Sequence, residues 1–99
     1  MNSRMMEMAE REIVQDTLLE ALEETGSMGM SLQVIEQLLK HQGVDTKKAK
    51  EVLWYMENKG WVIHKDYSNE RQGVSRIIYF ITAKGIDHLD GKEEKMADG

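Results

Sequence analysis

The sequence predicts one mainly helical domain with a small β-hairpin, an α+β fold, on three observations. The chain of 99 residues contains no proline, so no helix in it is interrupted by the residue that breaks helices most strongly. Apolar residues recur at helical spacing in three stretches before residue 60. Two short stretches between residues 61 and 81 then have the composition of strands, and in the second Ile77, Tyr79 and Ile81 fall on one face. A chain of this length can bury one hydrophobic core.

The first predicted helix covers residues 5–24 and ends before Gly26. Its apolar stripe consists of Met6, Ile13, Val14, Leu18, Ala21 and Leu22. The opposite face is acidic, and a charged face of this kind usually only solvates a helix. The methionines at its start indicate either a frayed end or an adaptable partner surface; they are Met1, Met5, Met6 and Met8.

The second and third predicted helices form a helix-turn-helix pair. Ser31 caps the helix 32–41, and Asp45 caps the next helix, which stops at Gly60. Each has one apolar face, formed by Leu32, Ile35, Leu38 and Leu39 in the first and by Ala49, Val52, Leu53 and Met56 in the second. The outer face of the helix 45–59 carries lysines near its start and Trp54 further along. This arrangement is typical of a recognition helix.

Two strands follow, at about 61–66 and 74–81, and the polar loop between them forms a protruding tip. Alternation places Ile77, Tyr79 and Ile81 on the core side. Ile78 and Phe80 then point outward, so we expect the N-terminus, the last helix or a second subunit to cover them.

Thr82 caps a short last helix, 83–90, whose inward residues are Ile86 and Leu89. From Gly91 the apolar periodicity ends. We therefore predict one domain over residues 1–90 and a flexible charged tail over residues 91–99.

The net charge of −5 argues against nucleic-acid binding, but its distribution does not. Residues 1–39 carry two basic and eight acidic side chains, a net charge of −6. Residues 40–76 carry eight basic and five acidic side chains, a net charge of +3. Residues 77–99 carry three basic and five acidic side chains. Phosphate binding depends on local potential, so the segment 40–76 keeps this function open.

The order of the predicted elements resembles a winged helix-turn-helix domain. Residues 56–62 (MENKGWV) look like the end of a recognition helix followed by a strand. Residues 79–85 (YFITAKG) look like the end of the second wing strand in MarR- and PadR-type transcriptional regulators. The resemblance covers residues 10–90 and implies transcriptional regulation. The acidic-arginine wing signature of MarR-type proteins and the long C-terminal dimerisation helices of both families are missing.

The sequence offers no catalytic site, cofactor site or metal site. It contains no cysteine, and no motif places a nucleophile or carboxylate beside His41, His64 or His88. An ArsR-type metal sensor would need cysteines or a ligand set on its last helix, where only Asp87 and His88 occur. No apolar run has the length of a signal peptide or membrane span, so we expect a cytoplasmic protein with no membrane contact.

Two functions from different classes remain open. In the first, the helix 45–59 enters the major groove of duplex DNA and the wing 66–76 lies on the backbone. The residues predicted to contact DNA are Thr46, Lys47, Lys48, Lys50, Trp54, Lys65, Asn69, Arg71, Gln72 and Arg76. In the second, the domain is a protein-interaction module that uses Trp54, Tyr55 and the acidic first helix. The plain alternative for the lysines is that they only solvate a helix. We also predict a homodimer, since the outward Ile78 and Phe80 need cover.

Overall fold

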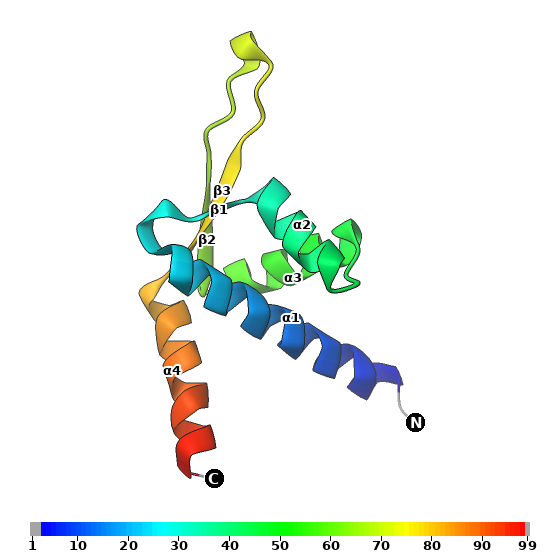
Figure 1. Ribbon diagram of the computed structural model, residues 1–99, viewed down its shortest axis with the longest axis vertical. Helices are drawn as coiled ribbons and strands as arrows, with labels where there is room; N and C mark the ends of the chain where they lie inside the picture. Colours follow the sequence, from blue (N-terminus) through cyan, green and yellow to red (C-terminus); the bar gives the residue numbers. More distant parts are fainter. Residues whose placement is uncertain (1–2, 99) are drawn as a thin grey trace.

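The structure, a computed structural model, describes the backbone of residues 3–98 and the side chains of residues 8–91. Figure 1 shows the order of its elements, which are α1 (Ser3–Thr25), the 3₁₀ turn η1 (Gly26–Met28), β1 (Met30–Ser31), α2 (Leu32–His41), α3 (Thr46–Asn58), β2 (Val62–Asp66), the 3₁₀ turn η2 (Glu70–Gln72), β3 (Ile77–Ile81) and α4 (Ala83–Asp98). The predicted fold class is confirmed: the chain is mainly helical with a small sheet. None of the described helices is long and apolar enough to cross a membrane.

The sheet contains three antiparallel strands in the order β1-β3-β2. The predicted hairpin forms its larger part, with pairing that runs from Val62 opposite Ile81 to Asp66 opposite Ile77. The short β1 adds to the other edge of β3, where Met30 lies opposite Tyr79. Beyond the ladder the hairpin continues as a long wing that projects away from the helices, closed near its tip by a bridge between Asn69 and Val74 (Figure 1).

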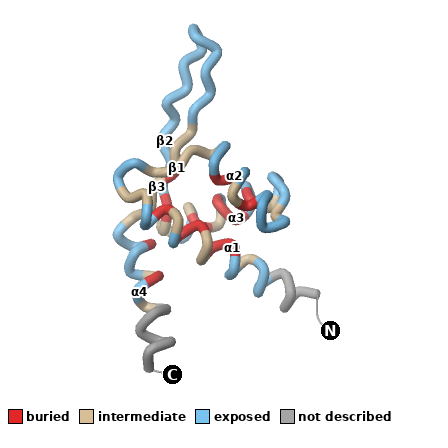
Figure 2. Tube along the Cα trace, viewed as in Figure 1, coloured by how far each residue is buried: buried red, intermediate tan, exposed pale blue. Residues whose placement is uncertain are grey.

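The core lies where α1, α2, α3 and the base of the sheet meet (Figure 2). Leu53, at the centre of α3, is only 1% exposed, which confirms its predicted burial. The predicted core residues that are buried are Leu18, Leu22, Ile35, Leu39, Val52, Leu53, Met56, Tyr79 and Leu89. Leu38 and Ile81 are half-buried and pack against this cluster. The sequence reading did not include Leu19, which is fully buried.

Two apolar residues predicted to face the core are exposed instead. Ile13 is 64% exposed, and Ile86 in α4 is 36% exposed. The buried sector of α1 runs through Val14, Leu18, Leu19 and Leu22, because α1 packs against α3, β3 and α4 rather than against one neighbour. That sector leaves Ile13 outside. Met1, Met5 and Met6, which the sequence reading singled out, lie outside the described side chains.

The last helix is longer than predicted. Residues 83–90 were expected to be helical, and α4 continues to Asp98. The missing apolar periodicity after Gly91 therefore does not end the helix, since none of these residues is a proline. The division into a domain over residues 1–90 and a flexible tail over residues 91–99 stays a prediction.

The outward face of β3 is covered by a segment that the sequence reading did not consider. Gly29 follows η1 with φ +68°, and a Cβ atom there would lie 2.7 Å from the Phe80 ring and 2.8 Å from an Ile78 methyl carbon. The connection between α1 and α2 therefore lies directly on Ile78 and Phe80, which are both half-buried. Neither the last helix nor a second subunit is needed to cover these two side chains.

Four elements meet at one joint around Gly60 and Trp61. Gly60, with φ +79°, ends α3: its N–H donates to the Glu57 carbonyl, and the Trp61 N–H donates to the Met56 carbonyl. The Thr82 hydroxyl donates to the Gly60 carbonyl at 2.6 Å and accepts from the Gly85 N–H at 3.1 Å. Thr82 is thus the predicted cap of α4, and it also joins β3 and α4 to the end of α3.

Gly85 explains the last position of the YFITAKG stretch. A Cβ atom at Gly85 would collide with the Trp61 carbonyl oxygen and lie 2.8 Å from Ile81 Cγ1. Only a glycine lets the first turn of α4 approach the start of β2 this closely. The indole of Trp61 in turn stacks on His88, with ring centroids 3.9 Å apart. The resemblance noted in the sequence therefore has a packing cause.

Candidate nucleic-acid interface

The outer face of α3 is the first part of the candidate interface. Asp45 caps this helix as predicted, with its carboxylate accepting from the Lys48 N–H at 2.8 Å. Lys47, Lys50 and Trp54 are all exposed at positions three, four or seven residues apart, so they line one side of the helix. Thr46 is also exposed, at the end where the helix dipole is positive. This surface attracts anions, although Glu51 lies within it and is exposed too.

Trp54 is the most prominent apolar group on this face. Its side chain is 69% exposed, and its backbone carbonyl accepts from the Asn58 amide at 2.7 Å. Single exposed apolar side chains are common on protein surfaces, but an exposed indole is available to a partner. Either of the two functions predicted from the sequence can use it.

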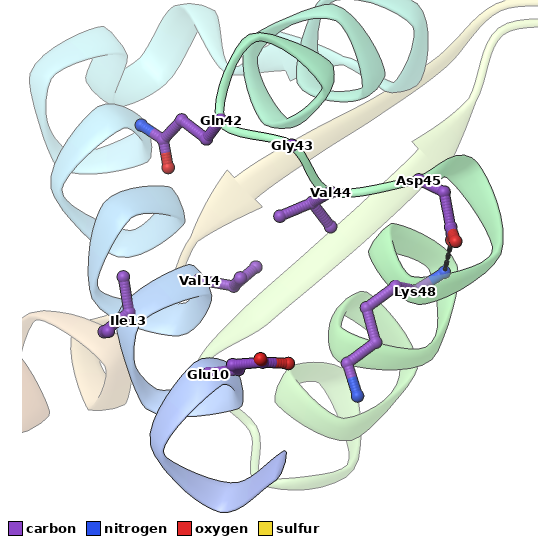
Figure 3. Close-up of a pocket in the computed structure, with 8 residues that line it drawn as sticks. All are labelled: Glu10, Ile13, Val14, Gln42, Gly43, Val44, Asp45 and Lys48. Carbon is purple, nitrogen blue, oxygen red and sulfur yellow. Dashed lines mark hydrogen bonds between the residues drawn. The ribbon is translucent and has the colours of Figure 1, made fainter. Parts of the chain in front are cut away.

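Lys48 lies between the outer face of α3 and α1. It is half-buried and lines a cavity together with Glu10, Ile13 and Val14 of α1 (Figure 3). It also lines a second hollow together with Lys50 and Trp54, so it borders the outer face of α3 as well.

The wing is the second part of the candidate interface. All five of its predicted contact residues are exposed; they are Lys65, Asn69, Arg71, Gln72 and Arg76. The Asn69 side chain already accepts from the Arg71 N–H at 3.1 Å, so part of its hydrogen-bonding capacity shapes the tip. At the start of the tip, the Ser68 hydroxyl and N–H bond to Asp66 and hold the pKa of its carboxyl below the ordinary value.

The predicted contacts on the two wing strands, Lys65, Asn69 and Arg76, lie on one face of the hairpin, because the paired positions 65–78, 67–76 and 69–74 are two residues apart along each strand. Lys65 lies opposite Ile78 in the ladder, so it points to the outer face, with its ammonium 5.5 Å from the centre of the Phe80 ring. Tyr67, Asn69, Gln72 and Arg76 line one shallow groove further out. Arg71 lies in the 3₁₀ turn at the tip. The cations are therefore spread along the wing rather than gathered at its end.

A side-chain hydrogen bond joins the wing to α3. The His64 Nδ1 of β2 lies 2.8 Å from the Glu57 carboxylate in the last turn of α3. Both side chains are partly exposed, so this pair adds only about 0–1 kcal/mol to stability. Its geometric effect is to fix the first strand of the wing against the end of α3. Sequence reasoning missed it because the partners are seven residues apart, on either side of a turn.

Tyr79 is buried beside the Glu57–His64 pair, and this burial changes the pKa of its hydroxyl. Tyr79 faces His64 across the ladder, with ring centroids 5.3 Å apart. Burial, helped by the negative charge of Glu57, raises the pKa of the Tyr79 hydroxyl to about 12. Tyr79 is therefore neutral at physiological pH, and it contributes no charge to the base of the wing.

Tyr55 belongs to the packing between α1 and α3. The Arg11 guanidinium lies 4.3 Å from the centre of the Tyr55 ring, and the Trp61 ring meets its edge at a centroid distance of 6.1 Å. Tyr55 is half-buried in this cluster. It is therefore less free to anchor a partner than Trp54, its neighbour in the sequence.

The three histidines lie in three different settings in the part of the chain that the structure describes. His64 pairs with Glu57, His88 stacks on Trp61, and His41 lies exposed at the end of α2. Within residues 8–91, no three His, Cys, Asp or Glu side chains gather where they could hold a metal ion.

Three helices, a three-stranded sheet and a projecting hairpin define a winged helix-turn-helix domain. No protein-family model and no curated protein sequence matches the chain. Among solved structures, the chain is similar to a PadR-like transcription factor from Bacteroides fragilis, with a TM-score of 0.78 and 18% identity over 96% of this chain and 90% of that one. It is also similar to a putative transcriptional regulator from Thermoplasma acidophilum, with a TM-score of 0.73 and 18% identity over 91% of this chain and 85% of that one.

The chain therefore has the fold of PadR-like transcription factors over nearly its whole length. The resemblance predicted from residues 56–62 and 79–85 is confirmed. Both similar proteins are described as transcriptional regulators and neither as an enzyme. At 18% identity the likeness concerns the fold, so the roles of individual residues rest on their own geometry.

Proposed function

We propose that this protein binds duplex DNA as a small transcriptional regulator, with α3 in the major groove and the wing 66–76 on the backbone. The observation that carries the proposal is that two exposed basic elements leave the same joint at Gly60. One is the outer face of α3, and the other is the wing, whose first strand is held to α3 by the pair of Glu57 and His64. A winged helix-turn-helix domain binds DNA with a recognition helix in the major groove and a wing on the sugar-phosphate backbone, so the two elements must be held in a fixed relative orientation.

The proposed contacts follow from position and chemistry. Thr46, Lys47 and Lys50 lie near the positive end of α3 and bind phosphates or base edges. Trp54 makes an apolar contact in the groove, of the kind a thymine methyl group offers. Lys48 reaches only the margin of this surface from its side of α3. The wing binds phosphates through Lys65, Asn69, Arg71, Gln72 and Arg76.

A salt titration of DNA binding tests this proposal. Replacing Lys47 and Lys50 by alanine should weaken binding to all duplexes and reduce the slope of log K against log salt by about one for each lost phosphate contact. Lys84→Ala is the matched control, since it removes an exposed lysine from α4 and should leave the slope unchanged. Unmodified protein that binds no duplex at low salt would refute the proposal.

The second candidate is a protein-interaction module centred on Trp54. The exposed indole favours it, because tryptophan is a frequent anchor at interfaces. The packing of Tyr55 under Arg11 weakens it, because a partner could then use only one of the two aromatic rings. The two candidates differ in the salt dependence of binding and in the role of Trp54. A Trp54→Ala variant that no longer binds a protein partner but keeps its affinity for DNA would favour the protein-interaction module.

We also infer that the protein is a homodimer. The sequence predicted a dimer because Ile78 and Phe80 were expected to need cover from a second subunit. That argument does not hold, because the connection between α1 and α2 lies on these two side chains. The support comes instead from α1 and α4, which diverge from the body as two arms (Figure 1). Met8 and Ile13 on α1 and Ile86 on α4 are exposed apolar side chains that pairing would bury. Two recognition helices would then lie about one turn of DNA apart.

Sedimentation equilibrium at micromolar protein concentration tests the dimer. We expect the mass of two chains, and Ile13→Glu should shift the equilibrium toward one. A single-chain mass for the unmodified protein would refute dimerisation without touching the DNA proposal. A cytoplasmic location, the absence of a cofactor and the absence of enzymatic activity complete the proposal.

A further inference from the structure

A cavity of about 520 Å³ lies between α1 and the turn that leads into α3 (Figure 3). Its walls come from three segments: the middle of α1, the turn 42–44 and the first turn of α3. Volumes of this order are usual for sites that hold small molecules. The cavity shares Lys48 with the margin of the proposed DNA surface and Asp45 with the cap of α3, and its remaining lining residues have no role in either.

Two opposite charges face the cavity without pairing. Glu10 extends from α1 and Lys48 from α3, and Figure 3 shows both side chains reaching into the same space. Neither forms a salt bridge within the described residues 8–91. Lys48 is half-buried, so its side chain lies partly against the cavity wall. A molecule that carries both charges would satisfy both side chains at once.

The rest of the cavity wall combines apolar side chains with Gln42 and Asp45, and the Asp45 carboxylate is already engaged in capping α3. Val14 is 5% exposed and Val44 is half-buried, and they form its inner surface. Ile13 stands at the rim and is 64% exposed, outside the buried sector of α1. An apolar group seated here would remove Ile13 from water at about 25 cal/mol for each Å² buried.

We infer that this cavity binds an α-amino acid with an apolar side chain. The ammonium group of the ligand pairs with Glu10, its carboxylate pairs with Lys48, and its side chain packs on Ile13, Val14 and Val44. A ligand with one charge only would leave the other protein charge unpaired, so a zwitterion is favoured over an amine or an acid.

The position of the cavity gives the ligand a regulatory consequence. Asp45 caps α3 and lies in the cavity wall, directly after the turn 42–44. A ligand held between α1 and this turn therefore acts on the orientation of α3. This consequence rests on the proposed DNA binding, whereas the binding of the amino acid does not. By linkage, DNA and ligand would change each other's affinity by the same factor.

Calorimetric titration of the intact protein, without DNA, tests the binding. The probes are leucine, isoleucine, valine, methionine and phenylalanine, followed by 4-methylpentanoate and leucinamide, which each lack one charge of leucine. At least one amino acid should bind, and both single-charge analogues of leucine should bind about tenfold more weakly than leucine, a difference of about 1.4 kcal/mol.

Charge-neutral variants assign the two contacts. Glu10→Gln should remove the preference for leucine over 4-methylpentanoate, and Lys48→Met should remove the preference for leucine over leucinamide. The matched controls are Glu12→Gln and Lys40→Met, whose exposed side chains lie outside the cavity and whose titrations should equal those of the unmodified protein. Circular dichroism confirms that each variant is folded.

Three results would overturn the inference. They are no heat of binding with any of the five amino acids, equal binding of leucine and its single-charge analogues, and equal effects of Glu10→Gln and Glu12→Gln. A protein that binds leucine but no DNA would keep the site and refute the proposed function. A protein that binds DNA but no amino acid would do the reverse.

Discussion

The effect of replacing Gly85 on stability can be predicted in detail, because it comes mainly from one contact, between the added Cβ atom and the Trp61 carbonyl oxygen. In Gly85→Ala the added methyl group meets the Trp61 carbonyl oxygen, so the first turn of α4 must move away from β2. The move strains two hydrogen bonds, from the Thr82 N–H to Trp61 at 3.0 Å and from the Thr82 hydroxyl to Gly60 at 2.6 Å. Lost bonds and overpacking together cost about 2–4 kcal/mol.

The helix itself works in the opposite direction. Alanine is better than glycine inside a helix by about 0.5–1 kcal/mol, so the net loss in the free energy of unfolding should be about 1–3 kcal/mol. In a domain of this size, the melting temperature falls by roughly 4–8 °C for each kcal/mol. Thermal unfolding followed by circular dichroism measures this change.

Gly91→Ala is the matched control in the same helix. A Cβ atom at Gly91 meets nothing within 4 Å, so only the gain in helix propensity remains. This variant should be more stable than the unmodified protein by about 0.5–1 kcal/mol. If both alanine variants changed stability in the same direction, the close approach of α4 to Trp61 would be wrong.

Three further predictions concern stability. Leu53→Ala should destabilise the fold by about 2–5 kcal/mol in urea unfolding, because Leu53 is fully enclosed, and a loss below about 1 kcal/mol would contradict that enclosure. Asp45→Ala should cost about 0.5–2 kcal/mol through the lost cap of α3, while Asp45→Asn should retain most of the stability. Tyr79 has a pKa of about 12 in the folded state against 10.0 as its ordinary value, so the unfolded chain loses its proton first as the pH rises. Stability should therefore fall between about pH 10 and 12, and Tyr79→Phe should fall less steeply over the same range.

Local chemistry allowed much of the fold to be predicted from sequence. Ser31, Asp45 and Thr82 cap their helices as expected, because each cap is a side chain bonded to a backbone N–H three residues later. The helix 32–41 and the stop at Gly60 follow from the same kind of local rule. These features depend on few residues, so periodicity and capping chemistry suffice to find them.

Packing between distant segments could not be predicted in this way. Ile13 and Leu19 are both apolar and near the same stripe of α1, and only the placement of α3, β3 and α4 around α1 decides that Leu19 is buried. The cover of Phe80 depends on the path of the chain after α1, which no periodicity describes. Lys48 shares its sequence neighbourhood with Lys47 and Lys50, yet it also lines the cavity beside α1.

The contacts at Gly60 and Trp61 couple the orientation of α4 to the orientation of the wing. Thr82 holds the base of α4 to the end of α3, and the ring of Trp61 at the start of the wing lies stacked on His88, one turn further along α4. A rotation of α4 must therefore either break this stack or carry the root of the hairpin with it. Because the wing projects far beyond the body, a small angle at the joint becomes a large displacement at Arg71 near the tip (Figure 1). A molecule that binds α4 and rotates it would therefore move the tip of the wing, which is the part of the protein farthest from α4.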